Sequence, residues 1–214
     1  ADPDGLKAYG STIEEARADL FGLYYVADPK LIELGLLPDA EAYKAQYYTY
    51  LMNGLMTQLV RIEPGNQIEE AHMRNRSLIA HWVYEKGKAD NVVELAEKDG
   101  KTYVKVNDYE RVRTLFGELL AEVQRIKSTS DLEAARRLVE DYGVKVDPAL
   151  HAEVLERYKK LNLAPYKGFV NPRYEAVTDA QGNIVDVKVS YSEGYAEQML
   201  RYSRDYATLP SRNN

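Results

Sequence analysis

Hydrophobic residues recur at helical spacing along the first two thirds of the chain. One stripe has members four residues apart: Tyr43, Tyr47, Leu51, Leu55 and Leu59. Side chains spaced by three or four residues share one face of an α-helix, so this stripe predicts a long helix over residues 39–62. Similar patterns predict further helices over residues 12–27, 67–85, 91–98, 109–126, 131–142 and 148–161.

Three local signals refine these helices. Asp131 and Asp147 are natural N-caps, and Pro148 fits the first turn of the helix that follows Asp147. Asp99-Gly100 is a dipeptide preferred in type I′ turns, and it is followed by Thr-Tyr-Val-Lys-Val over residues 102–106. We therefore expect a hairpin turn directly after the predicted helix 91–98.

The pattern changes near residue 165. Residues 164–168 resemble a linker, residues 174–177 and 184–191 alternate apolar and polar side chains, and a last helix is expected from Ser192 to about Tyr206. A two-stranded hairpin is not stable alone, so its partner strands lie outside this chain or it packs on the helices. The expected fold class is mainly α: a helical bundle over residues 1–165, then a small C-terminal β-hairpin and final helix over residues 166–214.

Composition excludes several classes of protein. The chain of 214 residues has no cysteine, which rules out disulfides, thiolate metal sites and cysteine nucleophiles. Its formal net charge of -6 argues against a broad nucleic-acid surface, and no apolar run is long enough for a membrane span. The N-terminus has neither an initiator methionine nor a recognisable signal segment, so we expect a processed chain or a fragment.

The densest cluster of candidate residues is acidic and lies in the first helix. Glu15 and Asp19 are four residues apart and share a face, whereas Glu14 lies about 100° round the helix from Glu15. One carboxylate could bind zinc while its neighbours orient histidine ligands through their second ring nitrogen. Spacing alone favours a simpler interpretation, in which Ser11 and Glu14 form a capping box.

The second candidate pair is His72 and Arg76, one turn apart on the predicted helix 67–85. Together they could stabilise an oxyanion or hold a substrate carboxylate. The stripe that His72 would share with Ile68 and Ile79 favours instead a satisfied core histidine.

The other two histidines have no partner at ligand spacing. His81 is expected at the helix surface or in packing, and His151 is expected in solvent early in its helix. The sequence has no glycine-rich phosphate loop and no G-x-S-x-G nucleophile motif. With three scattered histidines and no cysteine, the chain offers at most one good ligand to a zinc ion.

Two segments resemble the dipeptidyl peptidase III family. Residues 11–25, which contain Glu-Glu-Ala-Arg-Ala-Asp, resemble the family signature E-E-C-R-A-E/D, with Ala16 at the cysteine position. Residues 70–76, Glu-Ala-His-Met-Arg-Asn-Arg, resemble a further stretch containing H-M-x-x-R. The resemblance covers nearly the whole chain and is closest to Bacteroidetes-type members.

This resemblance implies a zinc metallopeptidase that removes dipeptides from the N-termini of short peptides. Glu15 would be the third zinc ligand, and Glu14 and Asp19 would orient the two histidine ligands. His72 would stabilise the transition state at the substrate carbonyl, and Arg76 would contact the substrate or support the network.

One departure from the family is large. The motif H-E-x-x-G-H, which carries two zinc histidines and the general base, is absent from the 214 residues. The resemblance therefore implies a C-terminal fragment of the zinc-bearing catalytic lobe that starts just after this motif and is inactive alone. Its partners would be short peptides and the N-terminal lobe of the same polypeptide, not nucleic acid or a membrane, and its location the cytoplasm. The alternative is a non-catalytic helical interaction or scaffold module.

Overall fold

The computed structural model of the chain describes residues 5–163 and 170–206. It divides into two compact units, residues 1–162 and 163–214, and each is described by itself. Helices dominate the described residues, so the expected mainly α class with a C-terminal hairpin and final helix is confirmed. The expected boundary at residues 165/166 and the expected linker 164–168 lie outside the described residues.

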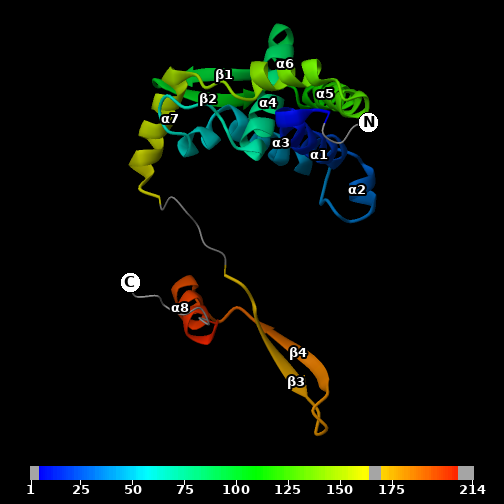
Figure 1. The fold of residues 1–214 in the computed structure, drawn as a ribbon, viewed down its shortest axis with the longest axis vertical. Helices are drawn as coiled ribbons and strands as arrows, with labels where there is room; N and C mark the ends of the chain where they lie inside the picture. The colour runs from blue at the N-terminus through cyan, green and yellow to red at the C-terminus, as the bar shows by residue number, and fades with distance from the viewer. Residues whose placement is uncertain (1–4, 164–169, 207–214) are drawn as a thin grey trace. The chain divides into compact units, whose positions relative to one another are not determined.

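The first unit consists of helices and one β-hairpin (Figure 1). Its α-helices are α1 (Gly10–Val26), α2 (Lys30–Glu33), α3 (Ala42–Leu55), α4 (Ala71–Lys86), α5 (Tyr109–Thr129), α6 (Leu132–Tyr142) and α7 (Pro148–Leu161). Three 3₁₀ turns and two strands complete it: η1 (Lys7–Tyr9), η2 (Thr57–Arg61), η3 (Lys88–Asp90), β1 (Val93–Lys98) and β2 (Lys101–Val106).

Helix α4 is the centre of the first unit. It packs against α1, α3, α5 and α6, and its buried residues lie on more than one face: Met73, Asn75, Ser77, Leu78, Ile79, Ala80 and Val83. A helix that is enclosed in this way is a core helix rather than an amphipathic surface helix. The orientation of α4 therefore sets the positions of the four helices around it.

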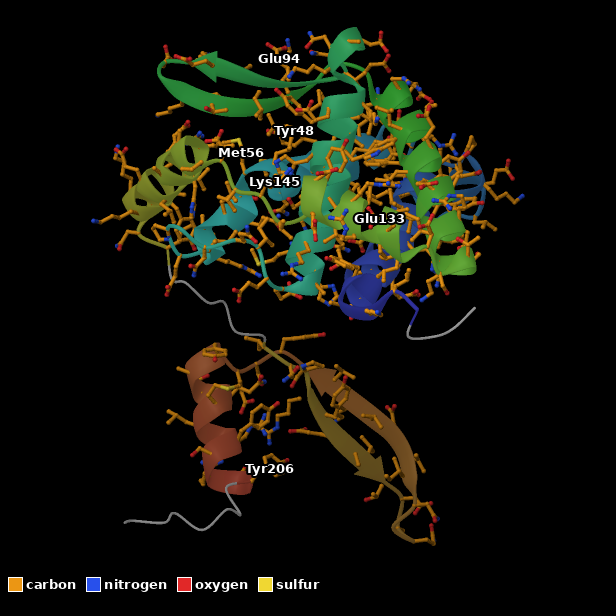
Figure 2. The ribbon with its side chains drawn as sticks, turned by 45° about the horizontal axis from the view of Figure 1, so that its top comes forward. Tyr48, Met56, Glu94, Glu133, Lys145 and Tyr206 are labelled. Carbon is orange, nitrogen blue, oxygen red and sulfur yellow. The ribbon has the colours of Figure 1, made fainter. Side chains whose placement is uncertain are left out.

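The crossing of α3 and α4 is unusually close at Gly54. A Cβ atom at this position would lie 2.4 Å from both the Ala80 Cβ and the Arg76 carbonyl oxygen. Such distances are shorter than any van der Waals contact, so only glycine allows this separation of the two backbones. Figure 2 labels Met56, where the chain leaves α3 with φ of -137° and the predicted helix 39–62 is interrupted.

The predicted helix 91–98 is wrong, because this segment forms strand β1. Asn91 has a positive φ of 51° and ends η3, after which the chain extends and β1 pairs antiparallel with β2. Asp99 and Gly100 both have positive φ, 53° and 67°, as a type I′ turn requires, so the predicted hairpin turn is confirmed. The hairpin packs beside α4 and α3, and this packing overrides the local helical pattern.

The surroundings of His151 differ from the prediction, whereas those of His81 agree with it. His151 is only 4% exposed, and its Nε2 lies 3.0 Å from the carbonyl oxygens of Leu59 and Ile62, so the predicted solvent position is wrong. Both carbonyl oxygens lie at the end of η2, where the Leu59 oxygen already accepts the Ile62 N–H and the imidazole N–H supplies a further donor. His81 packs within α4 against Ser77, as expected.

The second unit has little interior of its own. It contains β3 (Arg173–Thr178), β4 (Ile184–Ser190) and α8 (Tyr195–Tyr206), which ends at the Tyr206 labelled in Figure 2. Among its described residues only Gln198 is buried. The large hydrophobic side chains exposed in the described part of this unit are Leu163, Val170, Tyr174, Ile184, Val185, Val187, Val189, Tyr191, Tyr195, Leu200 and Tyr206. None of the described helices in either unit is both long and apolar enough to cross a membrane.

Gly54→Ala should lower the free energy of unfolding by about 1–3 kcal/mol, because the added methyl group forces α3 away from α4. Gly22→Ala is the matched control, since a Cβ at Gly22 in α1 meets nothing within 4 Å. That control should raise stability by up to about 1 kcal/mol through helix propensity. Urea denaturation of the chain measures both changes, and equal effects would contradict the close crossing.

Stability should fall on mild acidification through His81. Burial lowers the pKa of His81 below its ordinary 6.5, so the unfolded chain binds a proton at higher pH than the folded chain does. Stability that is complete above pH 6.5 is therefore lost as the pH falls through 6.5 toward the folded pKa. His81→Gln should remove this part of the pH dependence, which is at most about 1.4 kcal/mol per pH unit. Urea titrations across this pH range measure the stability of the unmodified and the His81→Gln proteins, and equal losses of stability in both would refute the prediction.

Candidate functional site

The segments that contain the two family-like motifs face each other across the α1–α4 contact. Glu15 lies in α1 and His72 in the first turn of α4, and the His72 Nδ1 is 3.2 Å from the Glu15 Oε2. The His72 side chain is 63% exposed, so the interpretation of His72 as a core histidine is wrong. Glu70 caps α4 by accepting hydrogen bonds from the backbone N–H groups of His72 and Met73. Helix α4 therefore begins at Ala71 rather than at residue 67 as predicted, and His72 lies exposed in its first turn.

A second contact between the same helices holds Asp19. The Oδ2 atom of Asp19 accepts hydrogen bonds from the Tyr50 hydroxyl at 2.8 Å and from the Asn75 Nδ2 at 3.0 Å. An ionised carboxylate can only accept, so the amide nitrogen of Asn75 must be the group that faces it. Tyr50 comes from α3 and Asn75 from α4, and both side chains are buried.

The electrostatics of this network follow from burial. Desolvation, together with the Asp19 carboxylate, raises the pKa of Tyr50 well above its ordinary value of 10.0, although Arg76 opposes the shift. The phenol therefore stays protonated and remains a donor to Asp19 at any physiological pH. The Oδ1 atom of Asn75 is buried without a hydrogen-bond partner among the described residues, which is a cost that packing alone does not explain.

Arg76 is held on the α3 side of α4. Its Nη1 donates to the Gln58 Oε1 at 3.3 Å, and the Gln58 amide donates in turn to the carbonyl oxygens of Gly54 and Met73. Gln58 therefore connects the end of α3 to the first turn of α4. His72 and Arg76 are one helical turn apart in α4, but they contact different elements. His72 contacts Glu15 of α1, whereas Arg76 contacts Gln58 of η2.

Glu14 is directed away from the other candidate residues. It pairs with Arg17 at 2.5 Å in α1 and with Lys127 in α5, and hydrogen bonds from Arg17 and then Lys127 hold its pKa below the ordinary 4.5. The proposed capping box is wrong, because α1 begins at Gly10 and its N-cap residue Tyr9 makes no side-chain capping hydrogen bond. The η1 turn runs directly into α1, so Ser11 is already inside the helix.

The described residues do not complete a metal site. No group of three or more His, Asp or Glu side chains in the described part of the chain could hold a metal ion. Glu15 fits the role of a single oxygen ligand, because its side chain is 36% exposed and, within the part of the chain that the structure describes, it pairs only with His72. Any further ligands must come from outside these residues.

Sequence reasoning missed Tyr50, Asn75 and Gln58. Asn75 lies inside the segment that resembles H-M-x-x-R, and Tyr50 follows Tyr47 by three residues on the buried face of α3. Helical spacing thus indicated burial at Tyr50. It gave no signal for the carboxylate opposite, because the partner lies 31 residues earlier in the chain.

Comparisons with known proteins agree with the sequence resemblance. A model of peptidase family M49 matches residues 4–193. Dipeptidyl peptidase 3 of Mus musculus is 29% identical over 147 residues, which are 64% of this chain and 20% of the mouse protein. Dipeptidyl peptidase 3 of Homo sapiens is 27% identical over 147 residues with the same coverage. The chain thus spans about a fifth of the length of these curated relatives.

The family match includes both segments that form the α1–α4 contact, as well as hairpin β3–β4 of the second unit. The expected resemblance to dipeptidyl peptidase III is therefore confirmed. The chain belongs to peptidase family M49.

Proposed function

We propose that this chain supplies part of the active site of a zinc-dependent dipeptidyl peptidase. The observation that carries the proposal is the double contact between α1 and α4, which sets Glu15 against His72 and Asp19 against Asn75. Both contacts use residues of the two family-like segments. A peptidase follows from family membership, whereas zinc and the release of dipeptides from short peptides are the finer proposal.

Glu15 is the proposed zinc ligand, and a bound zinc would polarise a water molecule and the scissile carbonyl. His72 lies beside Glu15 and is exposed, so it can donate a hydrogen bond to an oxygen that gains negative charge. Arg76 uses one donor on Gln58 and has further N–H groups for a peptide substrate. The Asp19 Oδ1 accepts no hydrogen bond from the described residues, so it can orient a histidine ligand. The same role for Glu14 stays a prediction, since Arg17 and Lys127 occupy its carboxylate.

The proposal requires groups that the sequence of 214 residues does not contain. H-E-x-x-G-H would supply two histidine ligands and the general base, and it is absent here. We therefore propose that the chain alone does not hydrolyse peptides and that it acts with the remainder of the same polypeptide. A cytoplasmic location also stays a prediction.

The second unit supports this dependence on further polypeptide. Residues paired directly across an antiparallel ladder share a face, so Tyr174 with Val189 and Ala176 with Val187 form an apolar face. The opposite face carries Glu175 paired with Lys188. The apolar face is exposed, yet the family match extends over it, which suggests a cover within the family's own longer chain.

The alternative function is a helical interaction or scaffold module without chemistry. Under this alternative, Glu14 is a helix cap and His72 is a core residue. Both assignments are wrong, because Glu14 is paired with cations and His72 is exposed beside Glu15.

Glu15→Gln in the full-length protein should reduce zinc content to near zero, because a neutral amide is a poor zinc ligand. His72→Ala should keep about one zinc per chain and lower kcat by roughly a hundredfold or more. Zinc analysis and release of a dipeptidyl-arylamide measure the two effects. Glu133→Gln, on the exposed surface of α6, is the control and should change neither. Full zinc and normal turnover in both site variants would exclude the proposed roles.

Val187→Asp should destabilise the full-length protein by about 2–3 kcal/mol if the apolar face of the hairpin is covered there. The same change in the 214-residue chain should alter stability by less than about 0.5 kcal/mol, since Val187 is exposed. Lys188→Gln, on the opposite face, is the control in both proteins. Thermal unfolding of the four variants tests the idea, which fails if Val187→Asp is equally harmless in both lengths.

A further inference from the structure

We propose that Tyr50 and Asn75 are positioning residues, which fix the Asp19 carboxylate so that it can orient a histidine ligand of the catalytic metal. This inference rests on the proposed zinc peptidase function and adds two residues to it. Neither residue belongs to the acidic cluster of α1.

The Asp19 carboxylate is held by hydrogen bonds to one of its two oxygens. Both hydrogen bonds end on the same oxygen, Oδ2, at 2.8 Å from the Tyr50 hydroxyl and 3.0 Å from the Asn75 amide. The donors come from α3 and α4, whereas Asp19 is on α1, so three helices determine the orientation of one carboxylate. The Oδ1 atom accepts no hydrogen bond from the described residues and remains able to accept an imidazole N–H.

The donors are also rigid. Tyr50 is 9% exposed and Asn75 is fully buried, so neither side chain can change rotamer without disturbing the core. Tyr50 precedes Gly54 by one turn of α3, and at Gly54 the α3 backbone approaches Ala80 and the Arg76 carbonyl of α4 too closely for a side chain. Rigid donors fix a ligand-orienting group better than flexible surface residues do.

A purely structural role explains these residues less well. A buried asparagine whose Oδ1 has no partner is unfavourable compared with an apolar side chain of similar size. Tyr47 lies in the same helix, three residues before Tyr50, and is an example of a tyrosine with a purely structural contact. Its hydroxyl donates to the Leu23 carbonyl oxygen at 2.8 Å and touches no candidate site residue.

Tyr47→Phe and Tyr50→Phe therefore form a matched pair. Each removes one hydroxyl from a buried tyrosine of α3 and one hydrogen bond of 2.8 Å. In the full-length protein, zinc affinity is measured by competition with a chelator, and the unfolding midpoint is measured without metal. We expect similar shifts of the midpoint, about a tenfold weaker zinc affinity for Tyr50→Phe, and less than about a twofold change for Tyr47→Phe.

Asn75→Ala provides a second test, because it removes the other donor to the same oxygen. It should also weaken zinc binding, and the double variant with Tyr50→Phe should lose less than the product of the two single effects. With zinc saturating, both variants should lower kcat more than they raise KM, because both side chains are buried and would act through Asp19 rather than on the substrate.

The outcomes separate this inference from the proposed function. If Glu15→Gln abolishes zinc binding while the two tyrosine variants bind zinc equally well, the positioning role is wrong and the peptidase assignment stands. If the unmodified full-length protein binds no zinc, or Glu15→Gln has no effect on binding, both are overturned. A selective loss of affinity in Tyr50→Phe supports both.

Discussion

The close crossing of α3 and α4 at Gly54 is the contact on which the first unit depends. Only the absence of a side chain allows the α3 backbone to approach Ala80 and the Arg76 carbonyl. Four residues before Gly54, Tyr50 reaches Asp19, and four residues after it, Gln58 joins Gly54 to Met73 and Arg76. Gly54 and the two polar residues four positions before and after it thus couple the core of the protein to the candidate site.

Helix α1 uses adjacent carboxylates for different purposes. Glu14 is directed toward α5, and Arg17 of α1 together with Lys127 of α5 neutralises it and holds its pKa low. Glu15 is directed toward α4, where its neighbour is an exposed histidine rather than a permanent cation. A carboxylate with two cationic partners stabilises a helix contact, whereas one with an exposed partner remains open to a metal ion or a substrate.

The second unit illustrates the opposite case, because Gln198 is the only buried residue in its described part. Polar interactions hold it together: Gln198 exchanges two hydrogen bonds with the Asn171 backbone, and Arg201 makes a bidentate ion pair with Glu193. These interactions order the start of the hairpin and α8 but bury little apolar surface. Burial of apolar surface is the main favourable term in folding, and the described residues of this unit bury little of it, in keeping with the proposal that further polypeptide covers the hairpin.

The sequence by itself determined the features that depend on neighbouring residues. Asp131 and Asp147 cap α6 and α7 as expected, and Asp99-Gly100 forms its turn, because each satisfies backbone groups or dihedral angles within a few residues. The two family-like segments were also visible directly. They led to the family without any knowledge of the fold.

Only the tertiary structure decided the environments of the polar side chains. The segment 91–98 became a strand, because β2 was there to pair with it and α4 to pack against it. His151 became buried and His72 exposed, in each case the reverse of what position along a helix suggested. Asn75 met Asp19 across 56 residues of chain. Helical spacing defines which face a side chain occupies, but the group opposite that face depends on how the whole core packs.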